Sequence, residues 1–128
     1  MIGSLLNNCE LEDILGGINL ATFDDFQKLD MRVGEIVRVE DLPKARKPAY
    51  KLWVDFGDDI GIKQSSAQIT DYYELTDLIG KQVLGVVNFP PMRVAGFKSE
   101  VLVMGVYAEQ GVVLIEPQQK VKKGDRLG

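Results

Sequence analysis

The spacing of apolar side chains along this chain changes from helical to strand-like near its first quarter. Over residues 9–20 they recur every three to four positions, as on one face of a helix. A second short stripe follows over Phe23–Leu29, directly after Thr22, which can cap a helix. From Met31 onward the period is two, which is typical of strands with one buried face. The pattern predicts an amphipathic helical segment followed by a β domain.

The β part predicts a barrel with one inserted helix. The expected strands cover residues 31–39, 50–56, 60–67, 83–89 and 101–106, with an additional short strand at 112–115. Between the third and fourth strands, Asp71 and Glu74 resemble a capping box, and Gly80 suits the end of that helix. Three strands, a helix and two strands is the order of an OB-fold, a five-stranded Greek-key barrel. An SH3-like barrel or a small sandwich is the alternative, and the inserted helix favours the OB-fold.

Charge is distributed unevenly along the 128 residues, which suit a single domain. The net charge is −4, but residues 1–30 hold six carboxylates and one lysine, so the remainder is nearly neutral. We expect an acidic leader over residues 1–22 and one domain over residues 23–128. The cations of this domain gather in three groups, each of which is either a binding surface or a solvated face. These groups are Lys44, Arg46, Lys47 and Lys51; Arg93 and Lys98; and Lys120, Lys122 and Lys123.

The residue inventory excludes several classes of chemistry. There is no histidine, so Ser-His-Asp and Cys-His catalysis are impossible. The one cysteine, Cys9, can form neither an internal disulfide nor a zinc site without histidine, and it is compatible with a reducing compartment. The start of the chain lacks a basic region, and no apolar run approaches the roughly 20 residues that span a bilayer. We expect a cytoplasmic protein with no catalytic site, metal, cofactor or membrane insertion.

Two polar segments are the candidate binding elements. Lys63-Gln64-Ser65-Ser66 continues a strand with few apolar groups, which indicates either a ligand surface or a protected edge strand. Asn88–Ser99 forms a loop stiffened by two prolines, in which Gly96 permits an unusual backbone conformation. In that loop Arg93 offers a fork for phosphate and Lys98 a second charge. We predict a phosphate-binding surface, with a loop made rigid only for packing as the alternative.

Two aromatic residues add a further possibility for this surface. Trp53 lies on the polar side of its strand, and Phe97 lies within the proline-stiffened loop. Aromatic rings on OB-fold surfaces stack on nucleic-acid bases. The pair is therefore a candidate stacking platform, or part of a protein interface.

Read together, three segments resemble the tRNA-binding domain family. They are residues 29–36 (LDMRVGEI), 63–69 (KQSSAQI) and 88–102 (NFPPMRVAGFKSEVL). The resemblance covers residues 23–128 and is closest to the free-standing CsaA branch, a bacterial chaperone linked to protein export. The family also includes the C-terminal appendage of methionyl-tRNA synthetases. Synthetase-linked members tend to follow the last serine with Gly-Met, whereas this chain has Glu100-Val101.

The resemblance implies an OB-fold homodimer without enzymatic activity that binds tRNA and unfolded polypeptide. By the family pattern, the tRNA contacts would be Lys63, Gln64, Ser65, Ser66, Asn88, Arg93, Lys98 and Ser99. The subunits would pair through Phe23, Phe26, Leu29, Val112 and Leu114. We therefore expect an export-related chaperone for unfolded or pre-secretory polypeptides that also binds tRNA. The alternative is a stand-alone, structure-specific tRNA-binding protein that assists aminoacylation.

Overall fold

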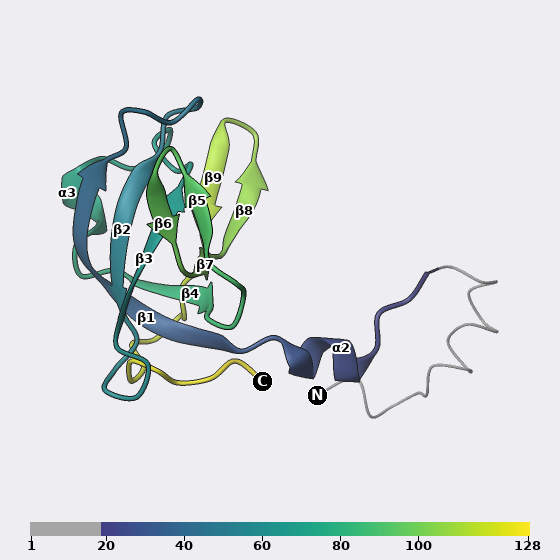
Figure 1. The fold of residues 1–128 in the computed structure, drawn as a ribbon. Helices are drawn as coiled ribbons and strands as arrows, with labels where there is room; N and C mark the ends of the chain where they lie inside the picture. The colour runs from purple at the N-terminus through teal and green to yellow at the C-terminus, as the bar shows by residue number, and fades with distance from the viewer. Residues whose placement is uncertain (1–18) are drawn as a thin grey trace.

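The computed structural model describes residues 19–128, in which an antiparallel sheet curls into a nearly closed barrel (Figure 1). Its strand order is β3-β2-β1-β4-β7. The strands are β1 (Met31–Asp41), β2 (Tyr50–Asp55), β3 (Ile62–Ala67), β4 (Gln82–Val86) and β7 (Leu102–Val103). Two hairpins and two short helices complete the description: β5 (Met92–Val94) with β6 (Phe97–Ser99), β8 (Gly105–Ala108) with β9 (Gly111–Leu114), α2 (Phe23–Lys28) and α3 (Leu75–Leu78). The OB-fold prediction is confirmed.

Strand alternation builds the core as the pattern predicts. Along β2, Leu52 and Val54 are fully buried, while Trp53 between them faces outward. Phe56 fills the centre of the barrel, and β1 passes close to it at Gly34. A Cβ atom at Gly34 would lie 2.5 Å from Cγ1 of Val54, so only glycine allows this approach.

The barrel closes where β3 meets the segment between β6 and β7. The amide of Glu100 donates to the carbonyl of Gln64 at 2.8 Å, and the amide of Gln64 donates to Oε1 of Glu100 at 3.2 Å. The hydroxyl of Ser65, 1% exposed, donates to the carbonyl of Val101 at 2.8 Å. We call this junction the β3 seam. It uses polar side chains of β3 in place of a regular ladder.

The helix between β3 and β4 begins later than the sequence predicts. It is capped at Glu74, whose amide donates to Asp77 Oδ2 at 3.1 Å, and not at Asp71. The preceding residues form a turn that supports the β8–β9 hairpin, because the amide of Leu114 donates to the hydroxyl of Tyr73 at 2.9 Å. This long-range contact competes with the helix and shortens it.

Of two other predicted strands, one ends early and the other is divided in two. β4 stops at Val86, three residues short of the prediction of residues 83–89. The predicted strand at 101–106 is interrupted at Met104, whose amide donates to Leu84 and whose carbonyl accepts from Ile115. The chain therefore leaves the barrel at Met104 and continues as the separate β8–β9 hairpin.

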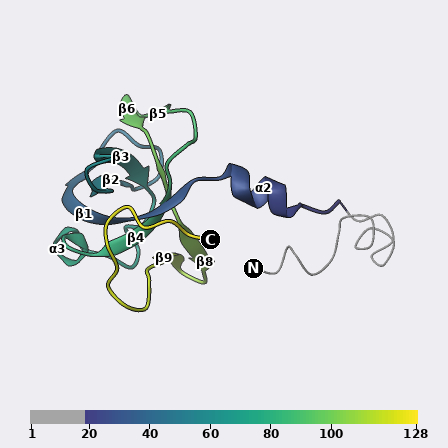
Figure 2. The same ribbon diagram turned by 90° about the horizontal axis from the view of Figure 1, so that it is seen from below.

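Helix α2 stands beside the barrel and not on it (Figures 1 and 2). The Thr22 cap is confirmed: its hydroxyl accepts from the amide of Asp25 at 3.0 Å. Phe23 and Phe26 stack with ring centroids 6.1 Å apart, yet no residue of the helix is buried. The helical pattern predicted for residues 9–20 lies almost entirely outside the described residues.

The C-terminal segment returns to the start of β1. The amide of Val33 donates to the carbonyl of Asp125, and the amide of Leu127 donates to that of Met31, both at 2.9 Å. The chain turns at Lys123-Gly124 and leads into this pairing. The end of the chain thereby covers an edge of β1 near α2.

A carboxylate at this end of the barrel makes stability depend on pH. The pKa of Asp55 is lowered, first by the amide of Gly57, which donates to Oδ1 at 2.9 Å, and then by the Lys123 ammonium, 3.0 Å from Oδ2. A lowered folded pKa contributes stability that is present above the unfolded value of 3.8 and is lost as pH falls through the folded value. We therefore expect Asp55→Asn to reduce the free energy of unfolding by about 1 kcal/mol at neutral pH. Urea unfolding across a pH series should show this difference disappearing in acid; a constant difference would contradict the assignment.

Candidate functional site

The segment read from sequence as a stiff loop contains the β5–β6 hairpin. Its two-residue turn, Ala95-Gly96, has positive φ at both positions (51° and 81°), as in the type I′ turns that match strand twist. The register places Arg93 directly opposite Lys98. Because Phe97 lies on the other face of the hairpin and contacts Trp53 of β2, the two cations project away from the barrel. The hairpin thus presents a pair of positive charges on a short rigid support.

This cation pair has no acidic partner among the residues that the structure describes. Within residues 19–128, neither Arg93 nor Lys98 forms an ion pair with a carboxylate, and both side chains are exposed. Arg93 Nη1 donates to the carbonyl of Gly96 at 3.2 Å, which orients the guanidinium. Like charges directly opposite on neighbouring strands destabilise a hairpin, and an anion between them removes the repulsion. The geometry therefore suits a phosphate group.

Four residues predicted as tRNA contacts hold the hairpin in place. Gln64 Nε2 donates to the carbonyl of Lys98 at 2.7 Å, and the amide of Ser66 donates to Ser99 Oγ at 3.2 Å. Ser65 is buried in the β3 seam. The carboxylate of Glu100 also belongs to the seam, through the amide of Gln64. These polar groups fix where the two cations stand.

An aromatic contact fixes the same hairpin from the outer face of β2. The rings of Trp53 and Phe97 meet edge to face with centroids 5.7 Å apart. The guanidinium of Arg38 lies 4.5 Å from the Trp53 ring centre, and the Lys51 ammonium lies 5.5 Å from that of Phe97. The two aromatic rings therefore contact each other, and a cation approaches each of them. The pair contributes hairpin anchoring and positive charge beside the cation pair.

Lys63 is not brought into this group. It pairs in register with Val54, on the face of β3 that Ser65 shares, whereas Gln64 lies on the opposite face. Its side chain is therefore directed to the other side of β3 from Gln64, which holds the hairpin. The structure thus gathers two of the three predicted phosphate-binding cations.

Asn88, another predicted tRNA contact, joins the barrel to α2. Its Oδ1 accepts from the amide of Asp30 at 2.9 Å, and its Nδ2 donates to the carbonyl of Lys28 at 2.7 Å. The carboxylate of Asp30 in turn binds Arg32 at 2.6 Å and lies 3.7 Å from Arg126. The amide of Asn88 therefore sets the direction in which α2 leaves the barrel.

We expect Asn88→Ala to loosen α2, because both backbone groups lose their side-chain partner. The expected cost is about 1 kcal/mol of stability, since both hydrogen bonds are near solvent. Amide exchange of Asp30, whose amide loses its acceptor, and of the last turn of α2 should accelerate, while tRNA affinity changes less than twofold. A large loss of tRNA affinity with unchanged exchange at α2 would instead place Asn88 in direct contact with RNA.

The predicted dimer residues divide into two groups. Phe23, Phe26 and Leu29 are half-buried on or directly after α2. Val112 and Leu114 of β9 pack against the barrel core of their own chain. The exposed apolar side chains of that hairpin are others: Val106, Tyr107 (94% exposed) and Val113. Residues 112–115 are all apolar, so this part of the sequence shows no alternation from which the exposed side chains could be recognised.

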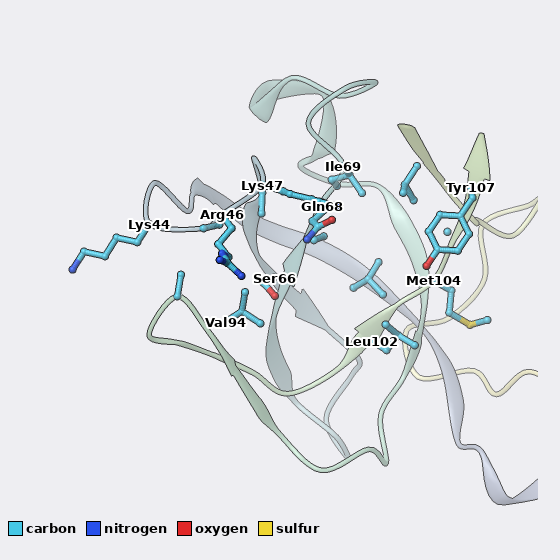
Figure 3. Close-up of a pocket in the computed structure, with 17 residues that line it drawn as sticks. Lys44, Arg46, Lys47, Ser66, Gln68, Ile69, Val94, Leu102, Met104 and Tyr107 are labelled. Carbon is cyan, nitrogen blue, oxygen red and sulfur yellow. The ribbon is translucent and has the colours of Figure 1, made fainter. Parts of the chain in front are cut away.

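A groove of about 710 Å³ lies beyond the end of the β3 seam (Figure 3). One end is bounded by the β1–β2 loop with Arg46 and Lys47, and by the turn of the β5–β6 hairpin. The other end is bounded by Tyr107, and Leu102 and Met104 supply apolar surface between the two ends. The sequence indicates the basic loop but not this groove, because the walls of the groove come from several segments that are distant in the chain.

Residues 19–128 contain no group of three or more histidine, cysteine, aspartate or glutamate side chains that could hold a metal ion. In the same range no helix has the length and apolar character needed to cross a membrane.

The fold and the site define an OB-like barrel that displays cations on a hairpin fixed by polar and aromatic contacts. The profile of the family described as "Putative tRNA binding domain" matches residues 31–126. The chain belongs to this family and is a CsaA-like member of it.

Solved structures and curated relatives agree with this assignment. The CsaA chaperone of Picrophilus torridus is 50% identical, with a TM-score of 0.81 over 85% of this chain and 100% of that one. The chaperone CsaA of Bacillus anthracis is also 50% identical, with a TM-score of 0.80 over 86% of this chain and 100% of that one. The methionine–tRNA ligase of Thermococcus onnurineus is 35% identical over 88% of this chain, which spans only 15% of that ligase.

Proposed function

We propose that this protein is a non-enzymatic, homodimeric chaperone of the cytoplasm that captures non-native polypeptides, pre-secretory chains among them, and also binds tRNA. The observation that carries the tRNA half is the cross-strand pair Arg93 and Lys98, which lacks a carboxylate partner within the described residues. Support for the chaperone half is the 50% identity to two CsaA chaperones over their full lengths.

In this proposal Arg93 and Lys98 contact backbone phosphates directly. Lys63 supplies a more distant positive charge, while Gln64, Ser65, Ser66 and Ser99 act by holding the hairpin. Such contacts carry little sequence information, so the shape of the folded RNA governs recognition. A net charge of −4 limits non-specific attraction, so the proposed binding depends on this local patch.

Polypeptide capture is assigned to the groove beside Leu102 and Met104. It combines apolar surface with a polar rim, which is the expected surface for non-native chains. Tyr107 at its end is almost fully exposed on the β8–β9 hairpin. Apolar side chains of α2 and of this hairpin supply the proposed dimer contacts, so the groove adjoins the second subunit.

A paired titration tests the two activities. The affinity for tRNA is measured at low and at physiological salt, beside an assay of aggregation of an unfolded client. Phosphate contacts release counterions, so tRNA affinity should fall steeply with salt. Capture combines apolar contacts with the cations at one end of the groove, so it should weaken with salt less steeply than tRNA binding. Salt-insensitive tRNA binding would refute the role given to the cations, and unimpeded client aggregation would refute the chaperone role.

The second candidate is a stand-alone tRNA-binding protein that assists aminoacylation. The similarity to methionine–tRNA ligases favours it, although the chain spans only about 15% of their length. It predicts tRNA binding without client capture, and faster aminoacylation when the protein is added to a methionyl-tRNA synthetase.

A further inference from the structure

Beyond the last contact of the β3 seam, the chain after β3 runs along the groove. The seam ends where the amide of Ser66 donates to Ser99. Two residues later, neither the amide nor the carbonyl of Gln68 has a hydrogen-bond partner within residues 19–128. Gln68 is exposed and lines the groove. This edge is therefore open to an added strand.

The opposite wall of the groove is a second strand edge. The amide of Met104 donates to Leu84, so this residue bonds toward β4. In an antiparallel ladder successive residues point their peptide groups to opposite sides. The peptide groups of Val103 therefore face away from β4, on the side where Val103 lines the groove. The wall of the barrel is thus open between the chain after β3 and β7.

Charge and apolar surface define what the groove would accept. The lining includes Lys44, Arg46 and Lys47 but no aspartate or glutamate. Figure 3 shows Arg46 directed toward the groove, whereas Lys44 points outward. Leu102 and Met104 offer apolar contacts further along. Apolar surface between two strand edges suits a polypeptide better than the sugar-phosphate backbone of RNA.

We propose that this groove binds an extended polypeptide segment with alternating acidic and apolar side chains, as a strand added between the chain after β3 and β7. The inference rests on the proposed chaperone function and names the chemistry of its substrate. Main-chain hydrogen bonds to residues such as Gln68 align the bound segment with the strand edges. Arg46 and Lys47 select carboxylates, and the apolar surface receives the alternate side chains.

Labelled ten-residue peptides test the chemistry by fluorescence polarisation. The reference peptide alternates Glu and Val; in two others, Lys replaces Glu or Ser replaces Val. We expect both replacements to weaken binding about tenfold or more. A fourth peptide, N-methylated at alternate amides of the reference sequence, should lose binding because it cannot pair with the strand edges.

Protein variants test the location. Arg46→Glu with Lys47→Glu should weaken binding of the Glu-Val peptide about tenfold. Lys120→Glu with Lys122→Glu, which makes the same change in net charge, should not. Gln68→Pro removes one free amide and should weaken binding, whereas Gln68→Ala, which keeps the amide, should not; thermal unfolding shows that each variant is folded.

The outcomes separate this inference from the function on which it rests. If the parent captures unfolded clients but binds the Glu-Val, Lys-Val and N-methylated peptides equally, the inference is wrong and the chaperone role stands. Failure of the parent to capture any client overturns the chaperone role instead. Stoichiometric displacement of the peptide by tRNA, together with loss of tRNA affinity in the Arg46 and Lys47 variant, assigns the groove to RNA and overturns the inference.

Discussion

The double variant Arg93→Ala, Lys98→Ala is expected to bind tRNA at least about tenfold more weakly than the parent at low salt. Both side chains are exposed, and in the described residues neither is paired with a carboxylate. Their removal therefore leaves no buried group unsatisfied and removes a like-charge contact, so thermal stability should be equal or slightly higher. Suppression of client aggregation should be nearly unchanged.

The matched control for this variant is Lys120→Ala with Lys122→Ala. It makes the same change in net charge on the exposed C-terminal segment. The control should retain most of the tRNA affinity. An equal loss in both variants would show that overall charge, and not the β5–β6 hairpin, governs RNA binding. Loss of client capture together with tRNA binding would show that both ligands share one surface.

Charges placed on α2 are expected to convert the protein from dimer to monomer. Phe23 and Phe26 stack on each other, and no residue of the helix is buried in its own chain. In the proposed dimer this apolar face lies against the second subunit, where an unpaired carboxylate would cost several kcal/mol. Phe23→Asp with Phe26→Asp should therefore give a mass near 14.2 kDa in light scattering, against twice that for the parent.

A control with the same added charge keeps this test specific. Ala21→Glu with Gln27→Glu places two carboxylates at exposed positions nearby, and it should remain dimeric. If the parent itself has the mass of one chain, the homodimer is wrong. If the Phe23 and Phe26 variant stays dimeric, the subunits pair elsewhere, and the exposed side chains of the β8–β9 hairpin become the contact.

The barrel could be predicted from sequence because strands such as β2 bury one face. In β2 every second residue is buried, so alternation alone gives both the strand and its inward face. The start of α3 could not be predicted, because Asp71-Tyr72-Tyr73 carries helix-like signals that lose to the contact of Tyr73 with Leu114. Local pattern gives way there to a hydrogen bond between distant residues.

The residue types of the candidate site can be predicted from the sequence, but the contacts that these residues make cannot. Arg93 and Lys98 were identified as cations, but their pairing depends on a turn at Ala95-Gly96 that lacks the usual Asn-Gly signal. The hydrogen bonds of Gln64 and Asn88 could not be predicted, because their partners lie far away in sequence. The open strand edge at Gln68 depends on where the barrel fails to close. Closure involves segments that are distant in the chain, so no local sequence pattern predicts it.

The salt dependence of tRNA binding, measured on the parent and on the Arg93→Ala, Lys98→Ala variant, tests the central claim most directly. Each phosphate contact contributes about 0.7 to 0.9 to the slope of log K against log salt concentration. With one or both subunits of a dimer on the RNA, the variant should lose a slope of about 1.4 to 3.6. Parallel lines for parent and variant would contradict the claim that these two side chains hold phosphates.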